Sequence, residues 1–253
     1  NRDIILCLDV STSMVTTDSR ILDTFSELLD TFDGERVGLV VWNSTAQTMV
    51  PLTDDYELLR DQLKEIADVL DFTPSRGNPA LGKYYETFAG TFGDVRGSSL
   101  VGDGLASCTL AFDARGQDRS RSIILATDNQ VYNDYGDQIY SLSQAADLAR
   151  QEGIRLFSLY GADPDMLDPD KSKADMDQAR NELKRVTLDH DGLFYEVDDA
   201  EAASGIINEL EADQVKEVGG NTEVRVTDMP QAAAVGLLAA VLVLLGLTAW
   251  RRV

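Results

Sequence analysis

The chain has 253 residues, which is enough for one domain with a sizeable hydrophobic core and additional segments. Hydrophobic residues make up 43% and charged residues 26% of it, as in an ordinary globular protein. The 44 acidic and 22 basic residues give a net charge of −22, and no run rich in Lys and Arg occurs, which argues against nucleic acid and anionic lipid as direct partners.

Short apolar segments alternate with helical patterns along the chain. Strands buried on both faces of a parallel sheet read as nearly continuous apolar runs. Four such runs occupy residues 3–9, 36–42, 121–127 and 154–160, and two further strands are expected at residues 46–52, edge-like and ending beside Pro51, and 193–197. Helices are expected at residues 21–32, 54–70, 100–112, 142–151, 174–188 and 200–210. The alternation predicts an α/β fold with a doubly wound, mostly parallel sheet and one antiparallel edge strand.

The connection at residues 71–97 is long and contains Tyr84, Tyr85, Phe88 and Phe92. Loops of this length inside a domain are usually functional or mobile. The aromatic side chains could form a surface that contacts a partner, or they could pack locally in a helical lid.

The C-terminal region has the pattern of a membrane anchor. Residues 231–250 contain no charge and end at Trp250, and Arg251 and Arg252 follow. A helix of 20 residues spans about 30 Å, and the positive-inside bias would place the arginines in the cytoplasm. We therefore expect a domain at residues 1–212, a stalk at 213–230, a transmembrane helix at 231–250 and a cytoplasmic end at 251–253. The domain would lie outside the cytoplasm, with its export signal removed before Asn1.

The two cysteines, Cys7 and Cys108, lie in apolar stretches far apart in the chain. Two distant cysteines do not make a disulfide framework, so we expect two buried free thiols. A single disulfide is the alternative, because a compartment outside the cytoplasm would permit it.

Oxygen-bearing side chains follow two of the predicted strands. Asp9 begins the segment DVSTS, which also holds Ser11 and Ser13, and Asp128 ends another strand. In the strand order 3-2-1-4-5-6 these two strands flank the point where ligands bind at the carboxyl edge of the sheet. Carboxylates and hydroxyls suit a hard cation, Mg²⁺ better than Ca²⁺, with Mn²⁺ remaining open. Alone, DVSTS could also be a helix N-cap with spare hydroxyls.

Three separated elements resemble the von Willebrand factor A (vWA) family. DVSTS matches its DxSxS metal-ion-dependent adhesion site, residues 97–105 resemble its threonine loop before a GDGL helix start, and residues 125–128 resemble its TD motif. The resemblance implies the Rossmann-like vWA fold over about residues 3–210. It also implies metal ligands Asp9, Ser11, Ser13, Ser99 and Asp128. Serine at position 99 stands where threonine is usual, and Asn129 replaces a glycine often found there. Ser98 would be the ligand if the alignment slips by one residue.

The family resemblance also implies partners. The last position on the ion is commonly taken by an acidic side chain of another protein. With a C-terminal anchor, the layout resembles bacterial Bat-type (BatA/BatB-like) proteins, which are associated with MoxR-type AAA ATPases, other vWA membrane proteins and envelope assembly or integrity.

Two other function classes compete with this interpretation. The first is a surface adhesin or pilus-type module with the same metal site. The second is a Mg²⁺-dependent hydrolase. Against catalysis, the single histidine, His190, lies in a predicted turn, and motifs for a serine nucleophile or a phosphate-binding loop do not occur. We therefore expect a protein-binding domain that is not an enzyme.

Overall fold

The computed structural model describes residues 2–74, 77–113, 119–133, 135–166 and 171–220. The chain divides into two compact units, residues 1–210 and 211–253, and the first carries the features described below.

A six-stranded mixed sheet forms the centre of the first unit. Its strands are β1 (Arg2–Asp9), β2 (Arg36–Trp42), β3 (Ala46–Thr53), β4 (Ser120–Thr127), β5 (Ile154–Tyr160) and β6 (Leu193–Glu196). Their order is β3-β2-β1-β4-β5-β6. Every neighbouring pair is parallel except β2 and β3, which are antiparallel. The strand order and the antiparallel edge strand predicted from the sequence are therefore confirmed.

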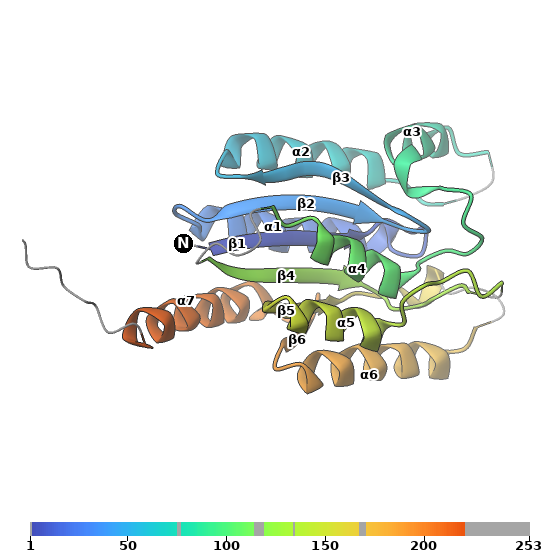
Figure 1. Ribbon diagram of the computed structural model, residues 1–253. Helices are drawn as coiled ribbons and strands as arrows, with labels where there is room; N and C mark the ends of the chain where they lie inside the picture. The colour runs from blue at the N-terminus through green and yellow to red at the C-terminus, as the bar shows by residue number, and fades with distance from the viewer. Residues whose placement is uncertain (1, 75–76, 114–118, 134, 167–170, 221–253) are drawn as a thin grey trace, which may run out of the picture. The chain divides into compact units, whose positions relative to one another are not determined.

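Helices cover both faces of the sheet (Figure 1). They are α1 (Val15–Thr31), α2 (Tyr56–Leu70), α3 (Ala80–Thr87), α4 (Val101–Leu110), α5 (Leu142–Gln151), α6 (Lys173–Asp189) and α7 (Ala202–Gly220). Short 3-10 helices occupy Ala89–Thr91 and Pro164–Met166.

The side-chain alternation of β1 produces two hydrophobic cores. Ile4, Leu6 and Leu8 point into the core with α1, α2, α3 and the start of α7. Ile5 and Cys7 point into the opposite core, with α4, α5 and α6. Because both faces of β1 are buried, its sequence shows no polar alternation.

The long connection at residues 71–97 packs onto the domain. It contains α3, in which Tyr84 is fully buried, with Phe88 fully buried just after the helix and Tyr85 half exposed. The Tyr84 ring makes edge-to-face contacts with Phe72, Phe88 and Phe92. Of the two interpretations of these aromatic residues, local packing of a helical segment is confirmed for Tyr84 and Phe88.

The prediction of a fold that includes a C-terminal transmembrane helix requires a correction. In the described part of the chain, no helix is long and apolar enough to cross a bilayer. The segment on which that prediction was based, residues 231–250, lies outside the described residues, as does the proposed cytoplasmic end at 251–253. Within the predicted stalk, α7 continues to Gly220.

The expectation of two free thiols was wrong, because Cys7 and Cys108 form a disulfide. Cys7 lies on the face of β1 that α4 covers, and Cys108 lies in α4. The helix approaches closely because Gly104 has no side chain: a Cβ there would lie 2.3 Å from the Trp42 ring. This packing brings the two Cα atoms to 6.1 Å, within the ordinary range for a disulfide.

Candidate functional site

The candidate site lies at the edge of the sheet where the parallel strands end. Asp9 is the last residue of β1 and pairs in register with Trp42, the last residue of β2. Thr127 ends β4, which is the other neighbour of β1, and Asp128 follows it. Because β1, β2 and β4 are parallel, the loops after all three strands leave from the same edge (Figure 1).

Asp9 is completely buried and accepts hydrogen bonds from both neighbouring segments. The backbone N–H of Ser11 donates to its Oδ1 at 3.0 Å, and the hydroxyl of Thr127 donates to its Oδ2 at 2.7 Å. The first bond orients the DVSTS loop, and the second joins β1 to β4 at the site. Asp9 is therefore fixed in direction by both neighbouring segments.

Ser11 and Ser13 connect Asp9 to Asp128. The two serine hydroxyls lie 3.1 Å apart, and the segment that carries them is not extended but turns into α1, with the N–H of Met14 bonded to the carbonyl of Ser11. The Ser13 hydroxyl also hydrogen-bonds the Asp128 carboxylate, which lowers the pKa of Asp128 against the larger effect of burial. Four of the five predicted ligands thus form one connected group: Asp9, Ser11, Ser13 and Asp128.

Ser99 comes from a third loop, just before α4. Its backbone N–H donates to Oδ1 of Asn43, and the hydroxyl of Ser98 donates to the same oxygen. Asn43 directly follows β2, and its carbonyl accepts the N–H of Leu100. The Asn43 side chain therefore fixes the Ser99 loop at the same sheet edge. Asn43 is buried, so it is a structural residue of this edge rather than the exposed acceptor of its formal glycosylation sequon.

Both departures from the family pattern occur where the backbone is left-handed. Ser99 has a φ of 50° and Asn129 a φ of 52°. A β-branched threonine is strained in this region, whereas asparagine is among the residues that tolerate it. At position 99, serine avoids the additional strain of a β-branched side chain. At position 129, in a different loop, asparagine adopts the left-handed conformation that glycine usually supplies.

The site gathers two buried carboxylates that repel each other. Burial raises the pKa of Asp9 to about 7, and repulsion from Asp128 adds to this effect. Burial also raises the pKa of Asp128, although hydrogen bonds and the nearby Lys171 oppose the shift. Two buried carboxylates in such proximity favour either a proton or a cation between them.

The residues present fit a hard divalent cation. The donors are carboxylate and hydroxyl oxygens, which Mg²⁺ and Mn²⁺ prefer over nitrogen and sulfur. Among the described residues, no group of three or more His, Cys, Asp or Glu side chains is placed to hold a metal. The predicted set has two carboxylates and three hydroxyls, so its binding strength depends on the serines as well as on the acids.

Two residues of the site were missed by sequence reasoning. Thr127 belonged to the TD motif of the resemblance, but its hydrogen bond to Asp9 was not predicted. Asp18 lies in the first turn of α1, fully buried, with both carboxylate oxygens lacking a hydrogen-bond partner among the described residues. Asp18 lies on the same apolar face of α1 as Ile21, Leu22 and Phe25. An acidic residue on the buried face of an amphipathic helix is unusual, and this feature of the sequence could have identified Asp18 as a candidate site residue.

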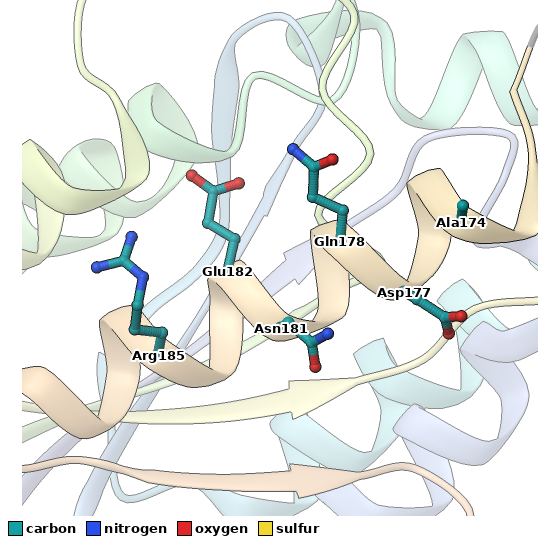
Figure 2. A pocket seen from close by; sticks show the side chains of 6 residues that line it. All are labelled: Ala174, Asp177, Gln178, Asn181, Glu182 and Arg185. Atoms are coloured by element: carbon teal, nitrogen blue, oxygen red, sulfur yellow. The ribbon is translucent and has the colours of Figure 1, made fainter.

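Two polar hollows lie along α6, and the smaller one reaches the loop after Asp128. One, of about 680 Å³, is lined by six side chains of α6, and Figure 2 shows Gln178, Glu182 and Arg185 projecting together from one side of the helix. The other, of about 320 Å³, extends to Asn129 and Gln130 in the loop after Asp128. Neither is lined by Asp9 or Asp128, so the cation site is distinct from both.

The loop that follows β4 carries exposed aromatic and aliphatic side chains. We name the described residues of this loop, 131–133 and 135–141, the aromatic rim; its large exposed side chains are Tyr132, Tyr135, Ile139 and Tyr140. Tyr132 pairs with Ser98, the neighbour of Ser99, in an isolated antiparallel bridge.

Further contacts hold the far end of the aromatic rim. The carboxylate of Asp103 accepts the N–H groups of Ile139 and Tyr140, and Arg96 forms a salt bridge with Asp137. The Arg96 guanidinium also lies over the Tyr135 ring. The rim is therefore held in place beside the predicted ligands while its side chains remain accessible.

The single histidine lies away from this edge. His190 follows α6, where its ring nitrogens contact the carbonyl of Val186 at 2.7 Å and the carboxylate of Asp147 at 3.1 Å. These contacts describe a residue that joins the ends of α5 and α6. The geometry gives His190 no connection to Asp9 or Asp128.

Comparisons with known proteins agree with the fold. A family model described as von Willebrand factor type A domain matches residues 4–130. No curated protein matches the chain.

Among solved structures, BatB from Bacteroides thetaiotaomicron has a TM-score of 0.57 at 20% identity and covers 85% of this chain and 100% of its own. An aerotolerance-related membrane protein from Bacteroides fragilis, with multiple mutations to serine, has a TM-score of 0.56 at 17% identity and covers 83% and 98%. Proximal thread matrix protein 1 from the mussel byssus, with a zinc-occupied MIDAS motif, has a TM-score of 0.51 at 18% identity and covers 83% and 44%. At these identities the likeness shows the fold alone.

Proposed function

The chain belongs to the von Willebrand factor type A domain family, and from this premise we propose that it is a protein-binding domain, not an enzyme, whose ligand binding depends on a divalent cation. The cation is Mg²⁺ or Mn²⁺, held by Asp9, Ser11, Ser13, Ser99 and Asp128. The observation that carries the proposal is the connected group of buried Asp9, Ser11 and Asp128 with half-buried Ser13 at the carboxyl edge of β1 and β4.

Each residue has a distinct task in this proposal. Asp9 and Asp128 supply the negative charge that attracts the ion, and the serine hydroxyls supply neutral oxygen donors. Thr127 and the N–H of Ser11 orient Asp9, and Asn43 holds the Ser99 loop. A bound divalent cation supplies positive charge that draws in an acidic side chain of the partner, with salt screening the repulsion between two acidic proteins beyond about 8 Å.

The aromatic rim supports a protein rather than a small molecule as the ligand. Exposed tyrosines next to a charged centre are typical of residues that contribute most to protein interfaces. The Asp103 and Arg96 contacts hold the rim in one arrangement before binding, which lowers the entropic cost of association.

The disulfide supports the compartment that we propose. Structural disulfides persist in oxidising environments and are rare in the cytoplasm. The buried Cys7–Cys108 bond therefore supports a domain that works outside the cytoplasm. There we propose a role in assembly or integrity of the cell envelope, in a Bat-like system with a MoxR-type ATPase and other vWA membrane proteins.

Titration calorimetry with MgCl₂ and MnCl₂ tests the metal. We expect one ion per chain for the wild type and no measurable binding for Asp9→Ala combined with Ser11→Ala. The matched control is Asp23→Ala combined with Ser26→Ala, which removes the same two residue types from α1 away from the site. Wild-type protein that binds neither ion would overturn the proposal.

A pull-down from solubilised membranes tests the partner. The wild-type domain should retain a protein that chelator releases and that the Asp9→Ala, Ser11→Ala variant does not retain. A protein retained equally with chelator counts against metal-dependent binding. Turnover of generic phosphoesters that Asp9→Ala abolishes would instead support a hydrolase.

A further inference from the structure

Asp18 has an environment that an ionised side chain seldom occupies. It is 0% exposed, both carboxylate oxygens are inaccessible to solvent, and neither has a hydrogen-bond partner within the described part of the chain. Burying a carboxylate without a partner costs several kcal/mol, so such residues usually neutralise a nearby charge.

The surroundings of Asp18 do not supply that charge. Burial and then repulsion from Asp9 and Asp128 are the influences on the carboxyl, and no cationic side chain of the described chain offsets them. Tyr84 is a nearby group with a proton to donate, but its hydroxyl already donates to the carbonyl of Val10 at 2.6 Å. Asp18 is therefore close to the predicted ligands and lacks a counter-charge.

Direct ligation of one ion by all three acids does not fit the geometry. The described residues contain no group of three carboxylate, histidine or cysteine side chains that could share a metal. Mg²⁺ ordinarily keeps several water molecules, however, and those waters need acceptors. A carboxylate one water layer away stabilises the ion by its charge and orients the water shell.

We propose that Asp18 is an outer-sphere carboxylate of the cation site, acting on the ion through water rather than as a ligand. This inference rests on the proposed function and assigns a positioning residue to it. Asp18 raises the affinity for a divalent cation, because its negative charge adds to that of Asp9 and Asp128. The same charge makes the metal-free site less stable.

Asp18→Asn tests the inference, since it removes the charge and keeps the shape. We expect the Kd for Mg²⁺ by calorimetry to rise about tenfold or more, in the range seen for groups beyond the direct ligands. The midpoint of thermal unfolding in chelator should stay equal or rise, while the increase caused by Mg²⁺ should shrink. Asp23→Asn is the matched control: it removes one negative charge from an exposed position of α1 and should leave the Kd unchanged.

The outcomes separate the two proposals. If the wild type does not bind Mg²⁺ or Mn²⁺, the proposed function fails. If the wild type binds and Asp18→Asn binds equally well, only the inference about Asp18 fails.

A measurement on the wild type covers the case in which the variant does not fold. A crystal structure with Mn²⁺ should show one water between the ion and an oxygen of Asp18. Direct ligation by Asp18, or an Asp18 carboxyl without such a water, would overturn the inference.

Discussion

The hydroxyl of Thr127, at the end of β4, donates a 2.7 Å hydrogen bond to the carboxylate of Asp9, at the end of β1. The same hydroxyl oxygen accepts the backbone N–H of Asn129 at 2.9 Å. One side chain thus connects the first predicted ligand to the loop that carries the last one, Asp128. The arrangement of the site depends on β1 and β4 being neighbours, although more than a hundred residues separate them in the chain.

Replacing Thr127 with valine keeps the shape and removes the hydroxyl. A buried hydrogen bond to a charged group is worth about 1.5–3 kcal/mol, so we expect the free energy of unfolding to fall by about that amount at pH 8. The Kd for Mg²⁺ should rise about tenfold to a hundredfold, because Asp9 loses the donor that orients it. Thr127→Ser retains the hydroxyl and should bind nearly as the wild type does. Calorimetry and urea unfolding of both variants check this.

The stability of the metal-free protein should depend on pH in a direction set by Asp9. Its pKa is about 7 in the fold and 3.8 for an ordinary aspartate, so between these values the folded state holds more protons than the unfolded state. The free energy of unfolding in chelator should therefore fall as pH rises from about 4 to about 7. Mg²⁺ should oppose that fall, because it binds the ionised form.

Asp9→Asn provides the control for this pH dependence. The variant has no titrating group at position 9, so the difference in unfolding free energy between it and the wild type reports the contribution of Asp9 together with its repulsion of Asp128 and Asp18. The exposed Asp137 and Asp175, whose pKa values are lowered by hydrogen bonds from Arg96 and Ser172, act mainly below pH 4. A difference that does not change between pH 4.5 and 8 would contradict the assignment.

Ser99 and Ser98 have different predicted roles, although they are adjacent. The Ser98 hydroxyl is bonded to Asn43, whereas Ser99 binds Asn43 through its backbone N–H and keeps its hydroxyl for the ion. Ser99→Ala should therefore weaken Mg²⁺ binding at least several-fold, and Ser98→Ala should change it much less. Calorimetry of the two variants compares them directly, and the reverse order would assign Ser98 as the ligand.

Removal of the disulfide should cost substantial stability. The Cys7–Cys108 bond closes a loop over a sequence separation of 101, and loops of that length restrict the unfolded chain strongly. We expect Cys7→Ala with Cys108→Ala to lose about 2–5 kcal/mol of unfolding free energy. Urea unfolding of the variant, and of the wild type with and without reductant, measures the loss. A variant as stable as the oxidised wild type would show that the bond does not stabilise the fold.

The aromatic rim should matter for the partner and not for the metal. Tyr135 and Ile139 are 64% and 78% exposed, so replacing both with alanine should leave folding and the Kd for Mg²⁺ unchanged. Retention of the partner should fall about fivefold or more, as is common for aromatic interface residues. Leu58→Ala with Leu188→Ala removes exposed apolar surface from α2 and α6 and should have no effect on retention. Equal loss in both double variants would mean that the rim is not specific.

The sequence predicted those parts of the fold whose patterns involve residues close together in the chain. The apolar runs of β1, β2, β4 and β5 and the amphipathic helices between them are local patterns, and the strand order confirmed what they predicted. The segment 71–97 mixes Gly, Pro and aromatic residues and has neither helical nor strand periodicity. The sequence therefore did not decide whether its aromatic side chains contact a partner or pack locally. The burial of Tyr84 and Phe88 decided between them.

The sequence by itself determined the α/β fold of the domain and five candidate ligands, because periodicity and short motifs depend on residues close together in the chain. Only the tertiary structure decided that Cys7 and Cys108 pair, that Thr127 bonds Asp9, and that the Asp18 carboxylate is buried without a hydrogen-bond partner among the described residues. Each of these depends on two segments meeting across the sheet, where a distance of a few ångströms determines whether a bond or a charge interaction forms. That distance is set by the packing of helices against strands, and no single stretch of sequence contains it.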